Sequence, residues 1–358
     1  PLVANWSLDN EGMKRAPQFL ARRNSNGERQ GDALVRNLLW VVQRSAAFAA
    51  DPKPGNLVGI KDGRMTGQWR DSEEGLGRGR YAYDVNAVFV PAALDAIDRL
   101  LKSDLLDSYL TEAQRRTLQQ AHAHHDVWSR KAPPSFIVKL PVEQARTRIT
   151  AYAASVGVDA SAPLAAIKGV SDGAFEFNAL ALDANGKPIP VMHSDDGFAL
   201  LLTAPTAEQL ERSILAIMRP FPAGLSTPIG LVVANPAFAD LETQARFGND
   251  AYHGTVVWSW QQAVLAAGLS RQLARTDLPA QIRSQLQGAK AQLWSAIDAT
   301  STLRTSELWT WSFSAGRYRA EAFGQHHAHV DESNAAQLWS TVFLSFQEGN
   351  WLGAEHAR

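Results

Sequence analysis

The sequence predicts a mostly helical, all-α fold, and two observations support this prediction. Apolar residues recur at three- and four-residue intervals along most of the 358-residue chain, which is the spacing of amphipathic helices. One stretch, residues 173–203, instead alternates apolar and polar residues as a strand does. About ten helices with a single β insertion favour one large helical domain over residues 1–358, such as a closed ring of helical hairpins.

The segment Asp32–Ala50 shows the helical pattern well, because Leu34, Leu38 and Val42 fall on one stripe. The other amphipathic segments are Asp84–Leu101, Glu112–Trp128, Val142–Val156, Ala207–Met218, Val256–Ala274, Pro279–Ile297 and Ala335–Phe346. Side chains that can accept a hydrogen bond at a helix start precede or open four of these segments, at Asp32, Thr111, Thr206 and Asp277.

The strand-like stretch 173–203 is centred on Asp183-Ala184-Asn185-Gly186, a sequence typical of a tight turn. The alternation on both sides of that turn predicts a β-hairpin or small sheet inserted between helices.

Composition excludes several classes of function. Lys plus Arg is 35 against 36 for Asp plus Glu, so charge gives no reason to expect nucleic acid or an anionic membrane as partner. The chain has no cysteine, which excludes disulfides and thiolate metal sites and is compatible with either cytoplasm or periplasm. No apolar run approaches the roughly 18 residues of a membrane span, and no signal peptide opens the chain. Because Pro1 stands first, we expect a processed or truncated product.

Four segments combine aromatic residues, amides and carboxylates just before or at predicted helix starts. They are Trp69-Arg70-Asp71-Ser72, residues 81–87, residues 249–261 and residues 331–340. Aromatic rings stack on the apolar faces of sugars, amides and carboxylates bind the hydroxyls, and two carboxyl groups supply acid and base for glycoside hydrolysis. The pattern therefore favours a carbohydrate site.

The motifs GQWRDS, YAYDVNA, YHGTVVWSWQQA and ESNAAQLWS resemble, in this order, the motif series of the six-hairpin glycosidases. This family includes trehalases, processing α-glucosidase I and the amylo-α-1,6-glucosidase part of glycogen debranching enzymes. The resemblance spans residues 67–340 and implies an (α/α)6 toroid that hydrolyses an α-glucosidic bond of an oligosaccharide with inversion. It implies no cofactor, and it commits to no calcium site.

The resemblance implies that Asp71 is the general acid and Glu332 the general base, although Asp331 is an alternative to Glu332. It also implies a set of residues that line the sugar pocket: Trp69, Arg70, Asp84, Asn86, His253, Trp258, Trp260, Gln261, Gln337 and Trp339.

The chemistry adds two expectations. The acid must carry a proton, which a guanidinium contact to Asp71 would oppose, so Arg70 should point at substrate or at another carboxylate. Inversion also requires room for a water, which places the two carboxyl groups roughly 6.5–9.5 Å apart.

The sequence departs from the family in its first part. No arginine- and aromatic-rich pocket motif precedes Gly67, and the twelve helices of a complete toroid are not all visible. We therefore expect N-terminal helices of the barrel to lie outside this chain and to be a partner of it.

Several other motifs favour structural roles. The clusters HAHHD (residues 122–126) and HHAH (residues 326–329) lack the ligand set of a zinc site, and HSDD (residues 193–196) predicts a turn at the pocket rim. Two alternatives to a hydrolase stay open: a sugar epimerase or lyase on the same barrel, and a non-catalytic carbohydrate-binding protein.

Overall fold

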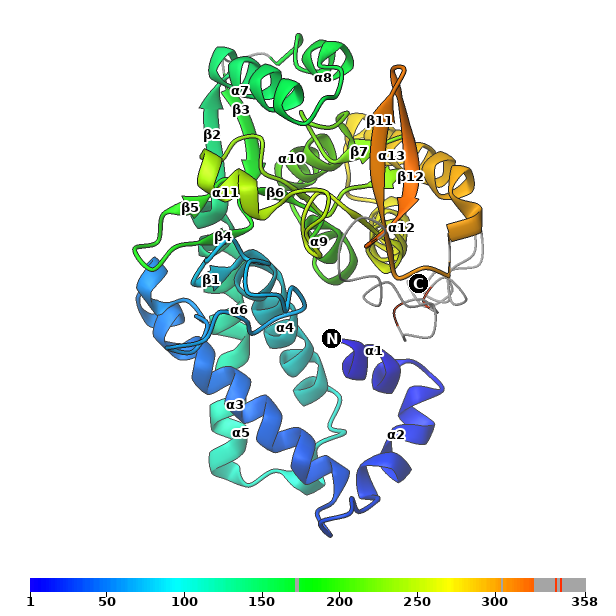
Figure 1. Cartoon of the computed structure of the whole chain (residues 1–358). Coiled ribbons are helices and arrows are strands. Elements are labelled where there is room, and N and C mark those ends of the chain that lie inside the picture. Colours follow the sequence, from blue (N-terminus) through cyan, green and yellow to red (C-terminus); the bar gives the residue numbers. More distant parts are fainter. Residues whose placement is uncertain (171–173, 304, 325–338, 340–341, 343–358) are drawn as a thin grey trace. The chain divides into compact units, whose positions relative to one another are not determined.

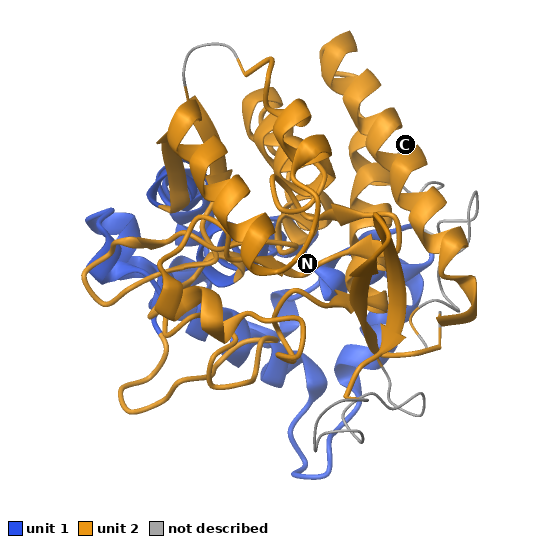
Figure 2. Cartoon of the chain, turned by 45° about the horizontal axis from the view of Figure 1, so that its top comes forward, with its two compact units in different colours: residues 1–59, 85–135 blue, residues 60–84, 136–358 orange. Residues whose placement is uncertain are grey.

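The computed structural model describes residues 1–170, 174–303, 305–324, 339 and 342 (Figure 1). Within this part of the chain the fold is mostly helical, which confirms the coarse form of the all-α prediction. The described residues divide into two compact units, which Figure 2 shows in different colours. Unit 1 comprises residues 1–59 and 85–135, and unit 2 comprises residues 60–84 and 136–358.

Unit 1 consists of helices, in which α3 and α4 both pack against α6. Its helices are α1 (Leu2–Leu8), α2 (Gly12–Ala21), α3 (Gln30–Ala50), α4 (Val90–Lys102), α5 (Glu112–Leu118) and α6 (Gln120–Lys131). Leu20, Leu100 and Leu106 are buried together in one of its apolar clusters, where α2 and α4 contribute side chains. The predicted helix Glu112–Trp128 is divided into α5 and α6, since α5 ends at Leu118 and α6 begins at Gln120.

The predicted helix Asp84–Leu101 begins in a wider form. Residues Asp84–Phe89 make a π-helical turn, and α4 continues from Val90 with Pro91 in its first turn. Proline has no N–H to donate to the preceding turn, so regular α-helical bonding cannot run through this point. π-Turns of this kind are frequent at functional sites.

Unit 2 contains seven described α-helices around a large apolar core. They are α7 (Val142–Ser155), α8 (Ser161–Ala166), α9 (Asp196–Leu202), α10 (Ala207–Met218), α11 (Leu241–Arg246), α12 (Ser259–Leu273) and α13 (Ala280–Ala299). Helix α12 packs closely on α9 because Gly268 leaves room: a Cβ there would lie 2.8 Å from Leu200 Cβ and 3.0 Å from the Leu201 nitrogen.

Five small antiparallel sheets lie among these helices in the described part of the chain. Their pairings are β1 (Tyr81–Ala82) with β4 (Ala181–Leu182) and β5 (Pro188–Ile189); β2 (Ile137–Pro141) with β3 (Ala174–Asn178); β6 (Met192–His193) with β9 (Ala234–Asn235); β7 (Ser226–Thr227) with β8 (Gly230–Leu231); and β10 (Val257–Trp258) with β11 (Leu308–Ser314) and β12 (Arg317–Ala322).

The predicted insertion 173–203 is correct in one part and wrong in two. The hairpin around Asp183–Gly186 is confirmed as β4–β5. Strands β3 and β6, however, pair with β2 and β9 outside the insertion, and its last residues form α9 instead of a strand. Alternation along a sequence specifies which side chains share a face, but it carries no information on a distant partner strand.

Two of the four predicted helix caps are confirmed. Thr111 and Thr206 each form a capping box with the glutamine three residues later. Asp32 instead lies in the first turn of α3 and pairs with Arg29, and Asp277 pairs with Arg275 ahead of α13. A neighbouring guanidinium thus takes the carboxylate that would otherwise cap the helix.

Candidate functional site

The candidate site lies in unit 2 and is built on the loop of residues 67–72, which has no regular secondary structure. Two adjacent side chains of the loop differ sharply in exposure: Arg70 is fully buried, whereas the side chain of Asp71 is 76% exposed. The Gln68 side chain accepts a hydrogen bond from the Arg70 nitrogen at 3.0 Å, which turns the loop tightly at this point.

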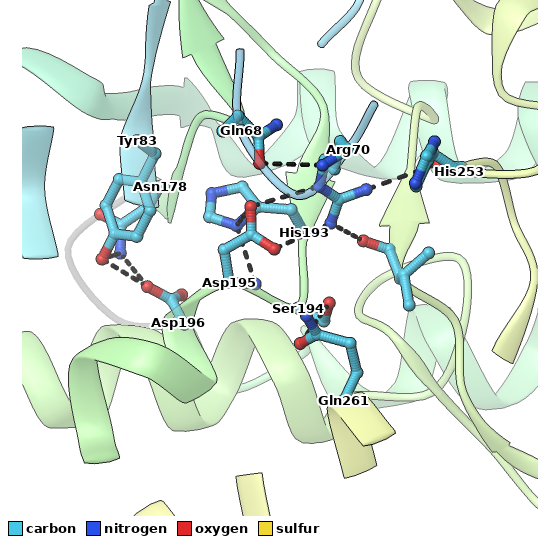
Figure 3. Close-up of polar contacts among 11 residues, drawn as sticks. Gln68, Arg70, Tyr83, Asn178, His193, Ser194, Asp195, Asp196, His253 and Gln261 are labelled. Atoms are coloured by element: carbon cyan, nitrogen blue, oxygen red, sulfur yellow. Dashed lines mark hydrogen bonds and ion pairs between the residues drawn. The ribbon is translucent and has the colours of Figure 1, made fainter. Parts of the chain in front are cut away.

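Arg70 anchors the loop through a buried ion pair (Figure 3). Its Nε and Nη2 donate to the two carboxylate oxygens of Asp195 at 3.2 and 3.0 Å, and Nη2 also donates to the Val233 carbonyl at 2.7 Å. The guanidinium carbon lies 4.4 Å from the centre of the Trp69 ring. The guanidinium is buried, so the carboxylate and the carbonyl supply the hydrogen bonds that solvent would otherwise supply, as a buried ion pair requires.

This arrangement meets the expectation that Arg70 points at another carboxylate and not at Asp71. Its donors bind Asp195 and two backbone carbonyls, and its side chain is fully buried, so among the described residues Arg70 serves to hold the loop.

His253 lies beside the candidate acid. Its Nδ1 is 2.7 Å from the Ser72 hydroxyl oxygen, its Nε2 is 3.7 Å from Asp71 Oδ1, and its carbonyl accepts from Arg70 Nη1 at 3.5 Å. Burial, together with the positive charge of Arg70, lowers the pKa of His253 to about 3. The imidazole is therefore neutral at physiological pH.

Three tryptophans cluster at this histidine, and two of them, Trp69 and Trp258, contact its ring. Trp69 meets Trp258 and Trp260 edge to face, at ring separations of 5.8 and 5.0 Å, and His253 stacks on Trp258 at 5.4 Å. Strand β10 and the first turn of α12 supply Trp258 and Trp260. Trp339, which is 42% exposed, stacks on Trp260 at 5.0 Å and offers the group an open aromatic face.

Several buried polar atoms of this group have no hydrogen-bond partner among the described residues. They are Gln68 Nε2, Trp69 Nε1, His253 Nε2, Trp260 Nε1 and Gln261 Nε2. The backbone N–H of Arg70 can only donate, so it fixes the oxygen of Gln68 and leaves Nε2 as the unpaired end. Ser194 Oγ donates to the oxygen of Gln261 at 3.2 Å. Buried donors are rarely left without a hydrogen-bond acceptor. These donors therefore suit ordered water, or a ligand with many acceptor oxygens.

A second polar network lies below the loop. The Tyr83 hydroxyl donates to Asp196 Oδ1 at 2.6 Å, and Asn178 donates to the same oxygen at 2.8 Å. Burial, and next the charge of Asp196, raises the pKa of Tyr83, while burial lowers the pKa of His193. Ser194 and Asp195 form the predicted turn, which leads into α9. The predicted position at the pocket rim is wrong, because all four HSDD residues are buried.

Sequence reasoning missed the role of Asp195, the partner of Arg70. The available signal in the sequence was the pair of adjacent acids, Asp195 and Asp196, at the start of the apolar run of α9. Acids next to such a run become buried, and a buried carboxylate requires a cation or hydrogen-bond donors as partners.

A pocket of about 390 Å³ borders the site on the side of Ser72 and His253. Its walls include Tyr252 and the ion pair between Glu74 and Arg246, which meet at 2.6 Å. The pocket therefore combines an aromatic wall with charged groups.

The other predicted residues are placed as follows. Asn86 belongs to unit 1, where its side-chain oxygen accepts from the Val58 nitrogen at 2.8 Å and its Nδ2 donates to the Val58 carbonyl at 3.0 Å. Asp84 is buried at the last position of the first segment of unit 2. Glu332, its alternative Asp331, and Gln337 lie outside the described residues.

Among the described residues, no group of three or more His, Asp or Glu side chains is placed to hold a metal ion. His124, from the first histidine cluster, bonds Ser45 at 2.9 Å within unit 1. No helix in the described ranges combines the length and apolar character of a membrane span.

No protein-family model matches the chain, and no curated protein is significantly similar to it.

Proposed function

We propose that this chain is an inverting glycoside hydrolase that cleaves an α-glucosidic bond of an oligosaccharide. Asp71 donates a proton to the leaving oxygen, and Glu332 activates the water that attacks the sugar from the opposite face. The proposal includes the (α/α)6 toroid as the fold that brings the two carboxyl groups together.

One observation carries the proposal. An outward-facing carboxyl group, Asp71, lies 3.7 Å from His253 Nε2 and follows Trp69 in the chain, and both of these rings belong to a cluster with Trp258. Several buried donors of this cluster and its neighbours have no partner among the described residues. Tryptophan faces and acceptor-seeking donors together are what a sugar ring, with its apolar face and its hydroxyl oxygens, requires. The buried Arg70–Asp195 pair supports the role of the acid, because it keeps the cation away from Asp71 while holding the loop.

The test is a panel of α-linked glucose disaccharides, with the anomer of the released glucose followed by NMR. We expect inversion for the wild type and a loss of at least about 100-fold in the Asp71→Asn and Glu332→Gln variants. Asp62→Asn is a matched control, since Asp62 is a 94% exposed acid of the same unit paired with Arg80. Retention of configuration, or full activity in Asp71→Asn, would refute the mechanism. Asp331→Asn distinguishes the two candidate bases.

A non-catalytic carbohydrate-binding protein is the second candidate, favoured by the high exposure of Asp71, which no described residue encloses. That function predicts disaccharide binding by calorimetry without product by NMR. An epimerase or lyase would need a basic residue, and the depressed pKa of His253 makes it a poor base.

A further inference from the structure

Ser72 and His253 form a hydrogen-bonded pair directly beside Asp71. The Ser72 oxygen lies 2.7 Å from Nδ1, so that ring nitrogen is occupied. The opposite nitrogen, Nε2, is buried without a partner among the described residues and faces Asp71 Oδ1 at 3.7 Å. A neutral imidazole carries one proton, and whichever group bonds one nitrogen determines what the other can do.

The surroundings hold the ring in place and keep it neutral. The ring lies nearly parallel to Trp258, at an angle of 9°, and nearly perpendicular to Trp69. The charged or titratable groups around it are Asp71 and Arg70 from the loop, Tyr252 from its own segment, and Glu73, Glu74, Arg246 and Asp250 from the wall of the neighbouring pocket. Arg70 is the charged group that contacts the His253 backbone, and its positive charge opposes protonation of the imidazole.

We propose that Ser72 and His253 are positioning residues for the acid: Ser72 donates to Nδ1, and Nε2–H then donates to the carboxylate of Asp71 as that carboxylate forms. This inference rests on the proposed hydrolase function and adds two residues to it. The gap of 3.7 Å must close when substrate binds, as contacts in unliganded active sites commonly do.

The proton balance of the step is simple. Asp71 transfers its proton to the glycosidic oxygen while the C–O bond breaks and its electron pair stays on that oxygen. Asp71 is left as a carboxylate, and His253 donates a hydrogen bond to it without giving up its proton. The hydrogen bond is strongest when the carboxylate is charged, so it stabilises the transition state more than the ground state.

The experiment compares two substrates that differ in their need for an acid: an α-linked disaccharide, and α-glucosyl fluoride, whose leaving group departs without protonation. The variants are His253→Phe, which keeps the ring; His253→Gln, which restores a donor at a similar place; and Ser72→Ala. We expect His253→Phe to lower kcat on the disaccharide on the order of 10- to 100-fold, and to leave the fluoride within about threefold of wild type. The alkaline limb of the kcat/KM pH profile should move to higher pH, and His253→Gln should recover part of the loss. Ser72→Ala should also lower kcat on the disaccharide and move the alkaline limb to higher pH, but both effects should be smaller than those of His253→Phe.

Equal losses on both substrates, or an unmoved alkaline limb, would overturn the inference and leave His253 with a purely structural role. Asp71→Asn separates this failure from failure of the proposed function, since it should lose the disaccharide activity and keep most of the fluoride activity. If Asp71→Asn shows no such selectivity, the hydrolase proposal fails, and this inference fails with it.

Discussion

The ion pair between Arg70 and Asp195 makes a sharp prediction about stability. Both side chains are almost fully buried, at 0% and 1% exposure, and Arg70 joins the acid loop to residues more than 100 positions away. Replacing Arg70 by Met removes the positive charge and the donor to the Val233 carbonyl, but leaves the carboxylate of Asp195 in place. A buried charge without its partner is expensive, because it has lost its water and gained no compensating charge.

Breaking a buried pair from one side costs about 3–5 kcal/mol. For a unit of this size that corresponds to a fall in melting temperature of roughly 10 °C. The double variant Arg70→Met/Asp195→Leu removes both charges together, and replacement of both partners by apolar residues is often neutral. It should therefore recover most of the loss while the acid loop stays unanchored, so that activity remains low although the fold is stable.

The assay is urea unfolding followed by tryptophan fluorescence, with disaccharide hydrolysis measured on the same samples. Arg78→Met is the control, because Arg78 is 56% exposed and forms a surface pair with Glu74, which should contribute less than about 1 kcal/mol. If Arg70→Met unfolds within about 1 kcal/mol of the wild type, the pair does not stabilise this unit as argued. A fully active double variant would show that Arg70 does not position the acid loop.

Three further outcomes follow from the same network. In the folded protein the pKa of His253 is about 3, whereas in the unfolded chain it is about 6.5. Below about pH 6.5 the unfolded chain therefore binds a proton that the folded protein does not bind, and the free energy of unfolding falls. Between pH 7 and 5 the wild type should lose about 2 kcal/mol more than His253→Phe in urea titrations, and equal losses would contradict the burial argument. Tyr83→Phe removes the donor at 2.6 Å from Asp196 and should lower the free energy of unfolding by about 1–3 kcal/mol, measured by the same titration. Trp260→Ala should weaken sugar binding about 3- to 10-fold by calorimetry, whereas Trp40→Ala, at a 60% exposed position of unit 1, should bind as the wild type does.

Local features of the fold could be predicted from the sequence, because the groups that cause them are near neighbours. The helix Ala207–Met218 and its Thr206 cap were predicted to the residue, since the cap, the glutamine that completes it and the apolar stripe lie within one short segment. The turn at Asp183–Gly186 was predictable for the same reason.

Long-range pairings could not be predicted in this way. Nothing near Arg70 indicates that its partner is 125 residues away. The expectation that it points at substrate or at another carboxylate came from the need of Asp71 for a proton, and that argument does not identify the partner. The partner strands of β3 and β6 were missed on the same ground, because strand pairing depends on the whole chain. The aromatic members of the site were predictable as residue types, while the His253–Ser72 contact required the fold.

The three tryptophans at the site also have an optical consequence. The indole planes of Trp69, Trp258 and Trp260 are nearly perpendicular to one another, with interplanar angles of 77°, 84° and 86° and separations of 5.0–6.4 Å. Chromophores this close share their excited states, so their absorption bands should split and contribute their own circular dichroism beside that of the helices. The chain has 11 tryptophans, so the indole bands also contain signal from outside this cluster. In a thermal melt, the split component would follow the integrity of this one loop and its neighbours, whereas the helical band would follow the rest of the fold. The protein thus carries an internal spectroscopic label at the place where the proposed chemistry occurs.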